Sequence, residues 1–161
     1  MKTLVAYYSR TGNTKKVAEA LAANLNADIE PIVSYLKDKS MASLAMQAFM
    51  RVRAKIGPTT KDTASYDLVV IGSPVWAGKI SSPIRTYLAQ NKKKFTSVAF
   101  FCTHGNPSSE ASAKMLESME KLAGKKTAGM LDVAANDVES GAYAEKVTRF
   151  ATALLESPSS P

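Results

Sequence analysis

The chain contains a single cysteine, Cys102, and no apolar run that approaches the roughly 20 residues of a membrane-spanning helix. One cysteine cannot close an intramolecular disulfide, which excludes a small secreted fold held by such bonds. The first apolar run, residues 4–8, is too short for the core of a signal peptide. We therefore expect a cytoplasmic protein that does not contact a membrane.

Acidic residues are the scarcer charged class, since 14 Asp and Glu against 21 Lys and Arg give a net charge of +7. Such an excess suits an acidic partner, a nucleic acid or an anionic cofactor. Basic residues concentrate between Lys37 and Lys61, but they are not interleaved with exposed aromatic side chains and match no known nucleic-acid motif. No nucleic-acid partner is expected.

The length of 161 residues, 45% of them apolar, fits one domain with one sizeable core. We assign this domain to residues 1–156. Residues 157–161, Ser-Pro-Ser-Ser-Pro, have nothing to bury and are expected to form a frayed, disordered tail.

Five apolar runs alternate with five helical patterns along the chain. The runs, rich in β-branched and aromatic residues, are 4–8, 29–33, 68–71, 98–101 and 130–134. This alternation predicts an α/β fold with a doubly wound, five-stranded parallel sheet and helices on both faces. Pro31 argues for an edge position and the continuous run 68–71 for the centre, which gives the strand order 2-1-3-4-5. Ligands of such sheets bind at the carboxyl ends of the strands, between strands 1 and 3.

Three of the helical patterns give specific expectations. Ser82 is expected to cap the third helix, with Pro83 at its first position, and Ser140 to cap the fifth. The second helical pattern extends from Met41 to Ile56, and its apolar residues are expected to pack inward. They are Met41, Leu44, Ala45, Met46, Ala48, Phe49, Met50, Val52 and Ile56. An alternative role for these methionines is a dimer surface or a lid over the ligand site.

The segment 9–14, Ser-Arg-Thr-Gly-Asn-Thr, links the first strand to the first helix and predicts a phosphate site. Its hydroxyl groups at Ser9, Thr11 and Thr14 can each donate to a phosphate oxygen, and Gly12 allows close approach of ligand and backbone. The helix start adds free N–H groups and the positive end of the helix dipole. An ordinary capped turn is the alternative interpretation.

Two further loops are expected to converge on this turn. In residues 73–80, Trp76 either stacks on a planar ligand or anchors the loop, since Pro74, Ala77 and Gly78 offer little to pack against. Residues 72–79 differ from a nucleotide P-loop in glycine spacing and in the residue that would hold magnesium, so a nucleoside triphosphate site is rejected.

The third loop, residues 103–109, contains the only histidine of the chain, His104. This histidine is interpreted as a solvated loop residue or as a group that supplies a proton near a cofactor. Cys102 is interpreted as a small residue at a strand end rather than a nucleophile, because no second cysteine or base accompanies it in the sequence.

Segment 9–14 and the stretch 72–78, Gly-Ser-Pro-Val-Trp-Ala-Gly, together resemble the phosphate loop and the first flavin-flanking loop of short-chain flavodoxins. The resemblance extends over nearly the whole chain and implies a non-covalently bound FMN that transfers electrons, with no catalytic residues and no metal. By this resemblance, the phosphate of FMN would be held by Ser9, Arg10, Thr11, Gly12, Asn13 and Thr14. The flavin ring would be flanked by Pro74, Val75, Trp76, Ala77 and Gly78, and its other edge by Thr103, His104, Gly105 and Asn106.

The chain departs from acidic electron carriers because it is basic and has no aromatic residue in 103–109. An open ring face favours, as the alternative, an NAD(P)H-dependent flavin or quinone reductase. A flavin-free interaction module of the same fold is a third interpretation. A receiver domain is excluded, because Ser9 and Ser73 stand where it needs acidic residues. The expected partner is a redox protein or a small electron acceptor, and the expected state is a monomer or a homodimer.

Overall fold

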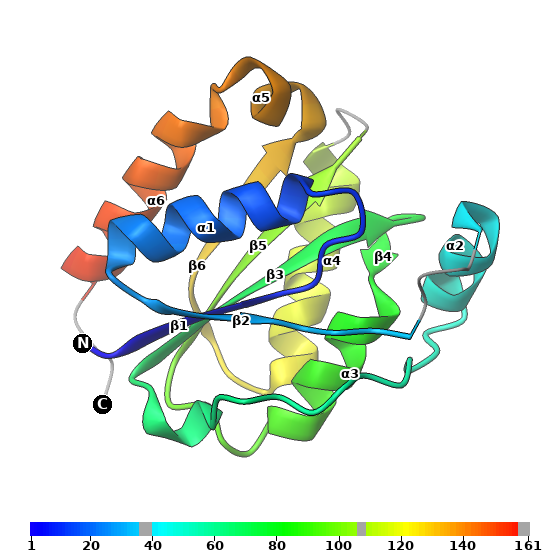
Figure 1. Ribbon diagram of the computed structural model, residues 1–161, viewed down its shortest axis with the longest axis horizontal. Helices are drawn as coiled ribbons and strands as arrows, with labels where there is room; N and C mark the ends of the chain where they lie inside the picture. The colour runs from blue at the N-terminus through cyan, green and yellow to red at the C-terminus, as the bar shows by residue number, and fades with distance from the viewer. Residues whose placement is uncertain (36–39, 106–108, 158–161) are drawn as a thin grey trace.

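The computed structural model describes residues 1–35, 40–105 and 109–157. Its centre is a parallel sheet in the order β2-β1-β3-β5-β6 (Figure 1). These strands are β1 (Thr3–Tyr7), β2 (Asp28–Pro31), β3 (Leu68–Trp76), β5 (Val98–His104) and β6 (Thr127–Ala134). A two-residue strand, β4 (Lys79–Ile80), pairs antiparallel with the end of β3. Without β4, this order is the predicted 2-1-3-4-5, and the doubly wound fold is confirmed.

Helices cover both faces of the sheet (Figure 1). One face carries α1 (Asn13–Leu25), α5 (Ala135–Ser140) and α6 (Tyr143–Glu156), and the other carries α2 (Met41–Phe49), α3 (Ser82–Asn91) and α4 (Ser109–Ala123). Each face has its own apolar core, and the neighbouring residues Phe100 and Phe101 of β5 belong to different ones. Successive strand residues point to opposite faces, so a central strand must be apolar throughout.

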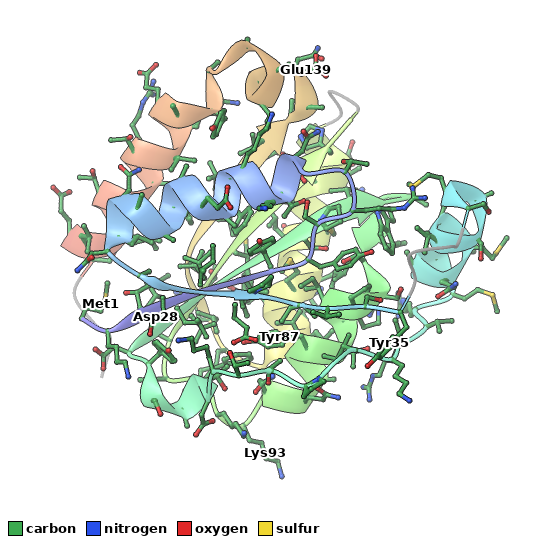
Figure 2. The ribbon with its side chains drawn as sticks, viewed as in Figure 1. Met1, Asp28, Tyr35, Tyr87, Lys93 and Glu139 are labelled. Atoms are coloured by element: carbon green, nitrogen blue, oxygen red, sulfur yellow. The ribbon has the colours of Figure 1, made fainter. Side chains whose placement is uncertain are left out.

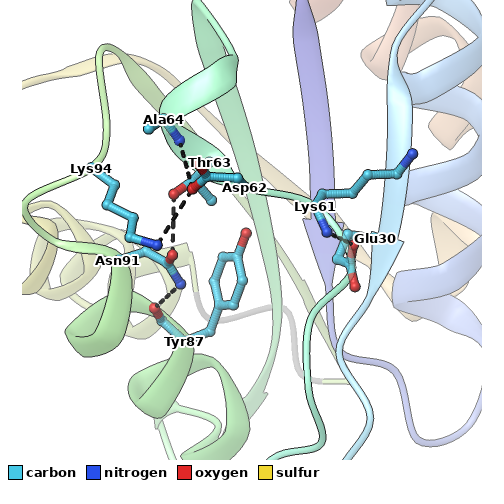
Figure 3. Close-up of polar contacts among 8 residues, drawn as sticks. All are labelled: Glu30, Lys61, Asp62, Thr63, Ala64, Tyr87, Asn91 and Lys94. Carbon is cyan, nitrogen blue, oxygen red and sulfur yellow. Dashed lines mark hydrogen bonds and ion pairs between the residues drawn. The ribbon is translucent and has the colours of Figure 1, made fainter.

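The strand β2 lies at an edge of the sheet, as Pro31 predicts, and Pro31 is its last residue. It contains a buried carboxylate that fixes the connection between α2 and β3. Glu30 accepts hydrogen bonds from the backbone N–H groups of Thr60 and Lys61, at 3.0 and 2.9 Å, and from the Thr60 hydroxyl at 2.8 Å. Figure 3 shows Glu30 beside Lys61. Further along the same connection, the Thr63 hydroxyl donates a hydrogen bond to Asn91 at the end of α3. These bonds stabilise the segment between α2 and β3, which includes a short 3-10 helix at Thr63–Ser65.

The second helix is shorter than predicted. α2 ends at Phe49 because Arg51 adopts a left-handed conformation, with φ of +57°. The N–H of Arg51 donates to the carbonyl of Ala48, and that of Val52 donates to the carbonyl of Gln47. These two bonds form the Schellman motif that terminates many helices.

The predicted inward packing of this segment is also wrong in part. Leu44 and Ala48 are buried in the core, and Ile56 packs against it. The remaining large apolar side chains are exposed, because α2 contacts the body of the protein along a narrow stripe only. They are Met41, Met46, Phe49, Met50 and Val52.

Two predicted helix caps are displaced in the structure. Ser81 caps α3, and Ser82 is its first residue, because the backbone N–H of Ser81 donates to the Ser73 hydroxyl and holds Ser81 in an extended conformation. Ser140 is the last residue of α5 rather than the cap of the final helix. Gly141, with φ of +83°, ends α5, and α6 begins at Tyr143.

Candidate functional site

The carboxyl ends of β1, β3 and β5 meet at a cavity of about 210 Å³, here called the strand-end cavity. Its lining is drawn from three separate segments of the chain and from α2 and α5. The lining residues are Arg10, Thr11, Asn13, Thr14, Met41, Pro74, Val75, Trp76, Thr103, His104, Gly105 and Ala135. All but Met41 and Ala135 are predicted site residues, so the structure brings the three predicted segments together.

Of the other predicted site residues, four lie next to the lining without being part of it, and one is not described. Ser9 and Gly12 belong to the turn before α1, and Ala77 and Gly78 form the tip of the β3–β4 hairpin. Asn106 lies outside the residues that the structure describes.

The turn before α1 is stabilised by a hydrogen bond within it. The Ser9 hydroxyl accepts a hydrogen bond from the Gly12 N–H at 3.1 Å, so its oxygen stabilises the turn. Gly12 caps α1 with φ of +105°, a backbone conformation that residues other than glycine rarely adopt. Apart from Gly12 and its two chain neighbours, no described residue has an atom within 4 Å of the place where a Cβ would stand. Space is therefore open beside the first N–H groups of α1, which have no acceptor within the helix.

A pair of buried hydroxyl groups joins the first and third segments. Thr14 Oγ1 lies 2.7 Å from Thr103 Oγ1, and both residues are at least 95% buried. Either hydroxyl can be the donor. When Thr103 donates, the hydrogen of Thr14 is available to a ligand in the strand-end cavity.

The second segment is not the loop that its proline and glycines predict. β3 continues through Ser73 and Pro74 to Trp76, and β4 returns beside it. Ala77 and Gly78 both have positive φ, +48° and +70°, which is the signature of a tight type I′ hairpin turn. The hairpin therefore presents residues of the cavity on a strand.

Trp76 is 97% buried and lies edge-on to Tyr8, with the ring centroids 5.6 Å apart and the planes at 89°. The expectation that it lacks packing partners is wrong, because Tyr8 at the end of the first run supplies one. Since Trp76 also lines the cavity, it combines the two roles that the sequence leaves open, a packed anchor and a wall of the site.

His104 is the last residue of β5 and not a solvated loop residue. Its side chain is 8% exposed, and Nε2 lies 2.5 Å from Oδ1 of Asp132 on the neighbouring strand β6. The imidazole is thus fixed in orientation at the edge of the cavity. Asp132 is absent from the predicted site, although an acidic residue within an apolar strand pattern is a signal that could have identified it.

Cys102 lies opposite Asp132 in the sheet, and its thiol is 3.5 Å from the same carboxylate oxygen. Burial, followed by the charge of Asp132, raises the pKa of the Cys102 thiol far above its ordinary value. A thiol that stays protonated is a poor nucleophile, in agreement with the structural role predicted for it.

The described residues contain no cluster of three His, Cys, Asp or Glu side chains that could hold a metal ion. Among the same residues, no helix is both long and apolar enough to cross a membrane. The chemistry available at the strand-end cavity is therefore that of hydroxyl and N–H donors, one arginine, one fixed imidazole and an apolar wall.

The family model described as Flavodoxin matches residues 2–147. The chain belongs to the flavodoxin family. Among solved flavodoxin-like structures, a flavoprotein from Lactobacillus acidophilus NCFM in complex with FMN is 28% identical, with a TM-score of 0.72. That match covers 86% of this chain and 97% of the other. The oxidised Flavodoxin 2 from Bacillus cereus is 19% identical, with a TM-score of 0.59 over 97% of this chain and 99% of its own, and supports the fold alone.

A protein of Cupriavidus metallidurans named NAD(P)H dehydrogenase (quinone) is similar to part of this flavodoxin-family chain. The two are 34% identical over 91 residues, which is 55% of this chain. The chain covers only 46% of that protein's length.

Proposed function

We propose that this protein binds FMN non-covalently in the strand-end cavity and transfers electrons to a redox partner protein or a small acceptor. The observation that carries the proposal is the convergence of the hydroxyl-rich turn, the β3–β4 hairpin and the end of β5 on one cavity. Membership of the flavodoxin family and similarity to the FMN complex of the Lactobacillus flavoprotein support it.

The residues present fit the two ends of an FMN molecule. The open space over Gly12, the hydroxyls of Thr11 and Thr14 and the start of α1 suit a phosphate monoester. Val75 and Trp76 supply an apolar wall that suits a planar ring. When bound, the flavin supplies the electron-transfer chemistry, and the protein supplies binding, orientation and electrostatics.

The protein's own residues have distinct roles in this proposal. Thr103 orients the Thr14 hydroxyl through their 2.7 Å hydrogen bond. Asp132 fixes the orientation of the His104 imidazole at the cavity edge through its contact with Nε2. The buried Trp76–Tyr8 contact holds the hairpin wall in place.

A titration of the apo-protein with FMN, followed by quenching of flavin fluorescence, tests the proposal. We expect saturable one-to-one binding, and Thr11→Ala should weaken it about tenfold because a hydrogen bond to a charged phosphate is lost. Thr11 is exposed, so this change should leave the fold intact. Thr152→Ala in α6, also exposed and distant in sequence, is the matched control and should bind like the wild type. Absence of FMN binding would contradict the proposal and favour a flavin-free interaction module.

The second candidate function is an NAD(P)H-dependent quinone reductase, which the similarity to the Cupriavidus protein favours. Steady-state oxidation of NADH or NADPH by the FMN-loaded protein, with a quinone as acceptor, separates the two. Turnover that depends on the nicotinamide nucleotide identifies the reductase, whereas a carrier reduces the acceptor only when a reduced partner protein supplies the electrons.

A further inference from the structure

A second cavity, of about 460 Å³, lies on the sheet face that carries α2, α3 and α4. We call it the basic cavity, because four of its seven lining residues are cationic. The lining residues are Arg51, Lys79, Ile80, Arg85, Ser118, Lys121 and Leu122. The β3–β4 hairpin contributes to both cavities, with Val75 and Trp76 in the strand-end cavity and their partners Ile80 and Lys79 in this one.

The cations of the basic cavity have no carboxylate partner within 4.0 Å among the residues that the structure describes. Arg85 Nε is buried and has no hydrogen-bond partner there. Burial lowers the pKa of the Arg85 guanidinium, and the nearby charges of Arg51 and Arg53 lower it further. A buried, unpaired donor among like charges is unfavourable unless an anion compensates it.

Arg51 adds an independent observation. It occupies the left-handed position that ends α2, with φ of +57°, where glycine is the ordinary residue. An arginine there strains the backbone, yet its side chain lines the basic cavity. Residues held in such strained conformations concentrate at functional sites, where the strain lowers local stability and the side chain is held in the position that binding requires.

We propose that the basic cavity binds the phosphate or diphosphate group of a small organic molecule. Two arginines and two lysines supply donors for phosphate oxygens, and the planar guanidinium groups suit bidentate contacts. The Ser118 hydroxyl donates to the Lys114 carbonyl, so the contacts to phosphate come from the four cations, while Ile80 and Leu122 give an apolar surface for the organic part. The volume exceeds what a single phosphate needs and lies in the usual range for small-molecule sites. This site is separate from the proposed flavin site and does not depend on it.

Calorimetric titration of the FMN-loaded protein with inorganic pyrophosphate and with ADP, at constant ionic strength, tests the proposal. We expect saturable binding of both ligands. If ADP binds more tightly than pyrophosphate, the cavity also contacts the organic part of its ligand. If the two bind equally, the cavity recognises the diphosphate group alone. Arg85→Met should weaken either ligand about tenfold, because a charge-assisted contact is lost. Lys121→Met, at an exposed position that tolerates substitution, should act in the same direction.

Lys93→Met is the matched control, since Lys93 extends into solvent beyond the end of α3 (Figure 2) and its loss changes the net charge equally. It should leave both affinities within about twofold. Equal weakening by Lys93→Met and Lys121→Met would overturn the proposal in favour of non-specific attraction, and so would the absence of binding at millimolar pyrophosphate. FMN binding, measured on the same variants, should be unchanged, so failure of this site is distinguishable from failure of the flavin site.

Discussion

The two cavities share the β3–β4 hairpin but offer an anion different donors. The strand-end cavity has hydroxyl groups and the N-terminus of α1, with Arg10 as its one arginine. The basic cavity has four cationic side chains. Hydroxyl and N–H donors are directional and short in reach, whereas arginine and lysine act through charge on long, flexible stems. We therefore expect the first cavity to select by geometry and the second by charge.

The cavities also differ in how well their polar groups are satisfied without a ligand. In the first, Ser9 bonds to the Gly12 N–H and Thr14 pairs with Thr103. In the second, Arg85 Nε is unpartnered within the described residues and Arg51 is held in a strained conformation. Substitution of the hydrogen-bonded hydroxyls in the first cavity should thus lower both stability and binding, while some substitutions in the second should lower binding and raise stability.

Thr14→Val has the largest expected effect. It breaks the bond to Thr103 and leaves a buried hydroxyl unpaired, which should lower the free energy of unfolding by about 1–3 kcal/mol. FMN affinity should also fall at least about tenfold, since the same hydroxyl is proposed to reach the phosphate. Urea denaturation and FMN titration measure the two effects. Thr14→Ser keeps the hydroxyl and should retain most of the stability and most of the FMN affinity. Equal losses of stability and affinity in Thr14→Val and Thr14→Ser would argue against the role of this hydrogen bond.

Arg51→Gly should separate stability from binding in the basic cavity. Glycine adopts the left-handed conformation without strain, so the free energy of unfolding should rise by about 1 kcal/mol. Pyrophosphate affinity should fall, because one of the four cations is lost. Arg53→Gly, at an exposed neighbour outside the cavity lining whose charge also acts on Arg85, is the control for loss of a charge without relief of strain, and should not raise the free energy of unfolding in this way. A stability unchanged or lowered by Arg51→Gly would show that the arginine is not strained.

Salt has the smallest expected effect and sharpens the contrast between the cavities. Raising the ionic strength from about 0.01 to about 1 M shortens the Debye length from about 30 to about 3 Å. Pyrophosphate binding should weaken steeply over this range, and FMN binding should weaken less, because its proposed donors are mainly neutral groups. Parallel titrations in a series of NaCl concentrations provide the comparison. Identical salt dependence would mean that both ligands are held chiefly by charge.

The strand-end cavity could be predicted largely because its donors are contiguous in the sequence. Residues 9–14 form one strand-to-helix turn, and the rules of parallel sheets place the ends of β3 and β5 beside it. The apolar strand pattern around Asp132 marks this residue as unusual, but its contact with His104 depends on the register between β5 and β6, which the pattern does not give.

The basic cavity could not be predicted from the sequence, because its cations come from the turn after α2 and from β4, α3 and α4, and only packing brings them together. The hairpin was missed for a different reason. Pro74 and Gly78 predict a loop. Near the end of β3, however, the strand tolerates a proline, which has no backbone N–H to donate to the neighbouring strand. Gly78 suits the positive φ of the hairpin turn. Similarly, the early end of α2 depends on Arg51 adopting a conformation that its residue type disfavours.

The most direct measurement is a titration of the isotope-labelled apo-protein with FMN, followed by amide chemical shifts in two-dimensional NMR spectra. The largest shifts should appear at Thr11, Asn13, Thr14 and the Trp76 indole N–H, with Arg51, Lys79 and Lys121 little changed. The largest shifts at the residues of the basic cavity, or binding without any change at the turn before α1, would contradict the assignment of the strand-end cavity as the flavin site.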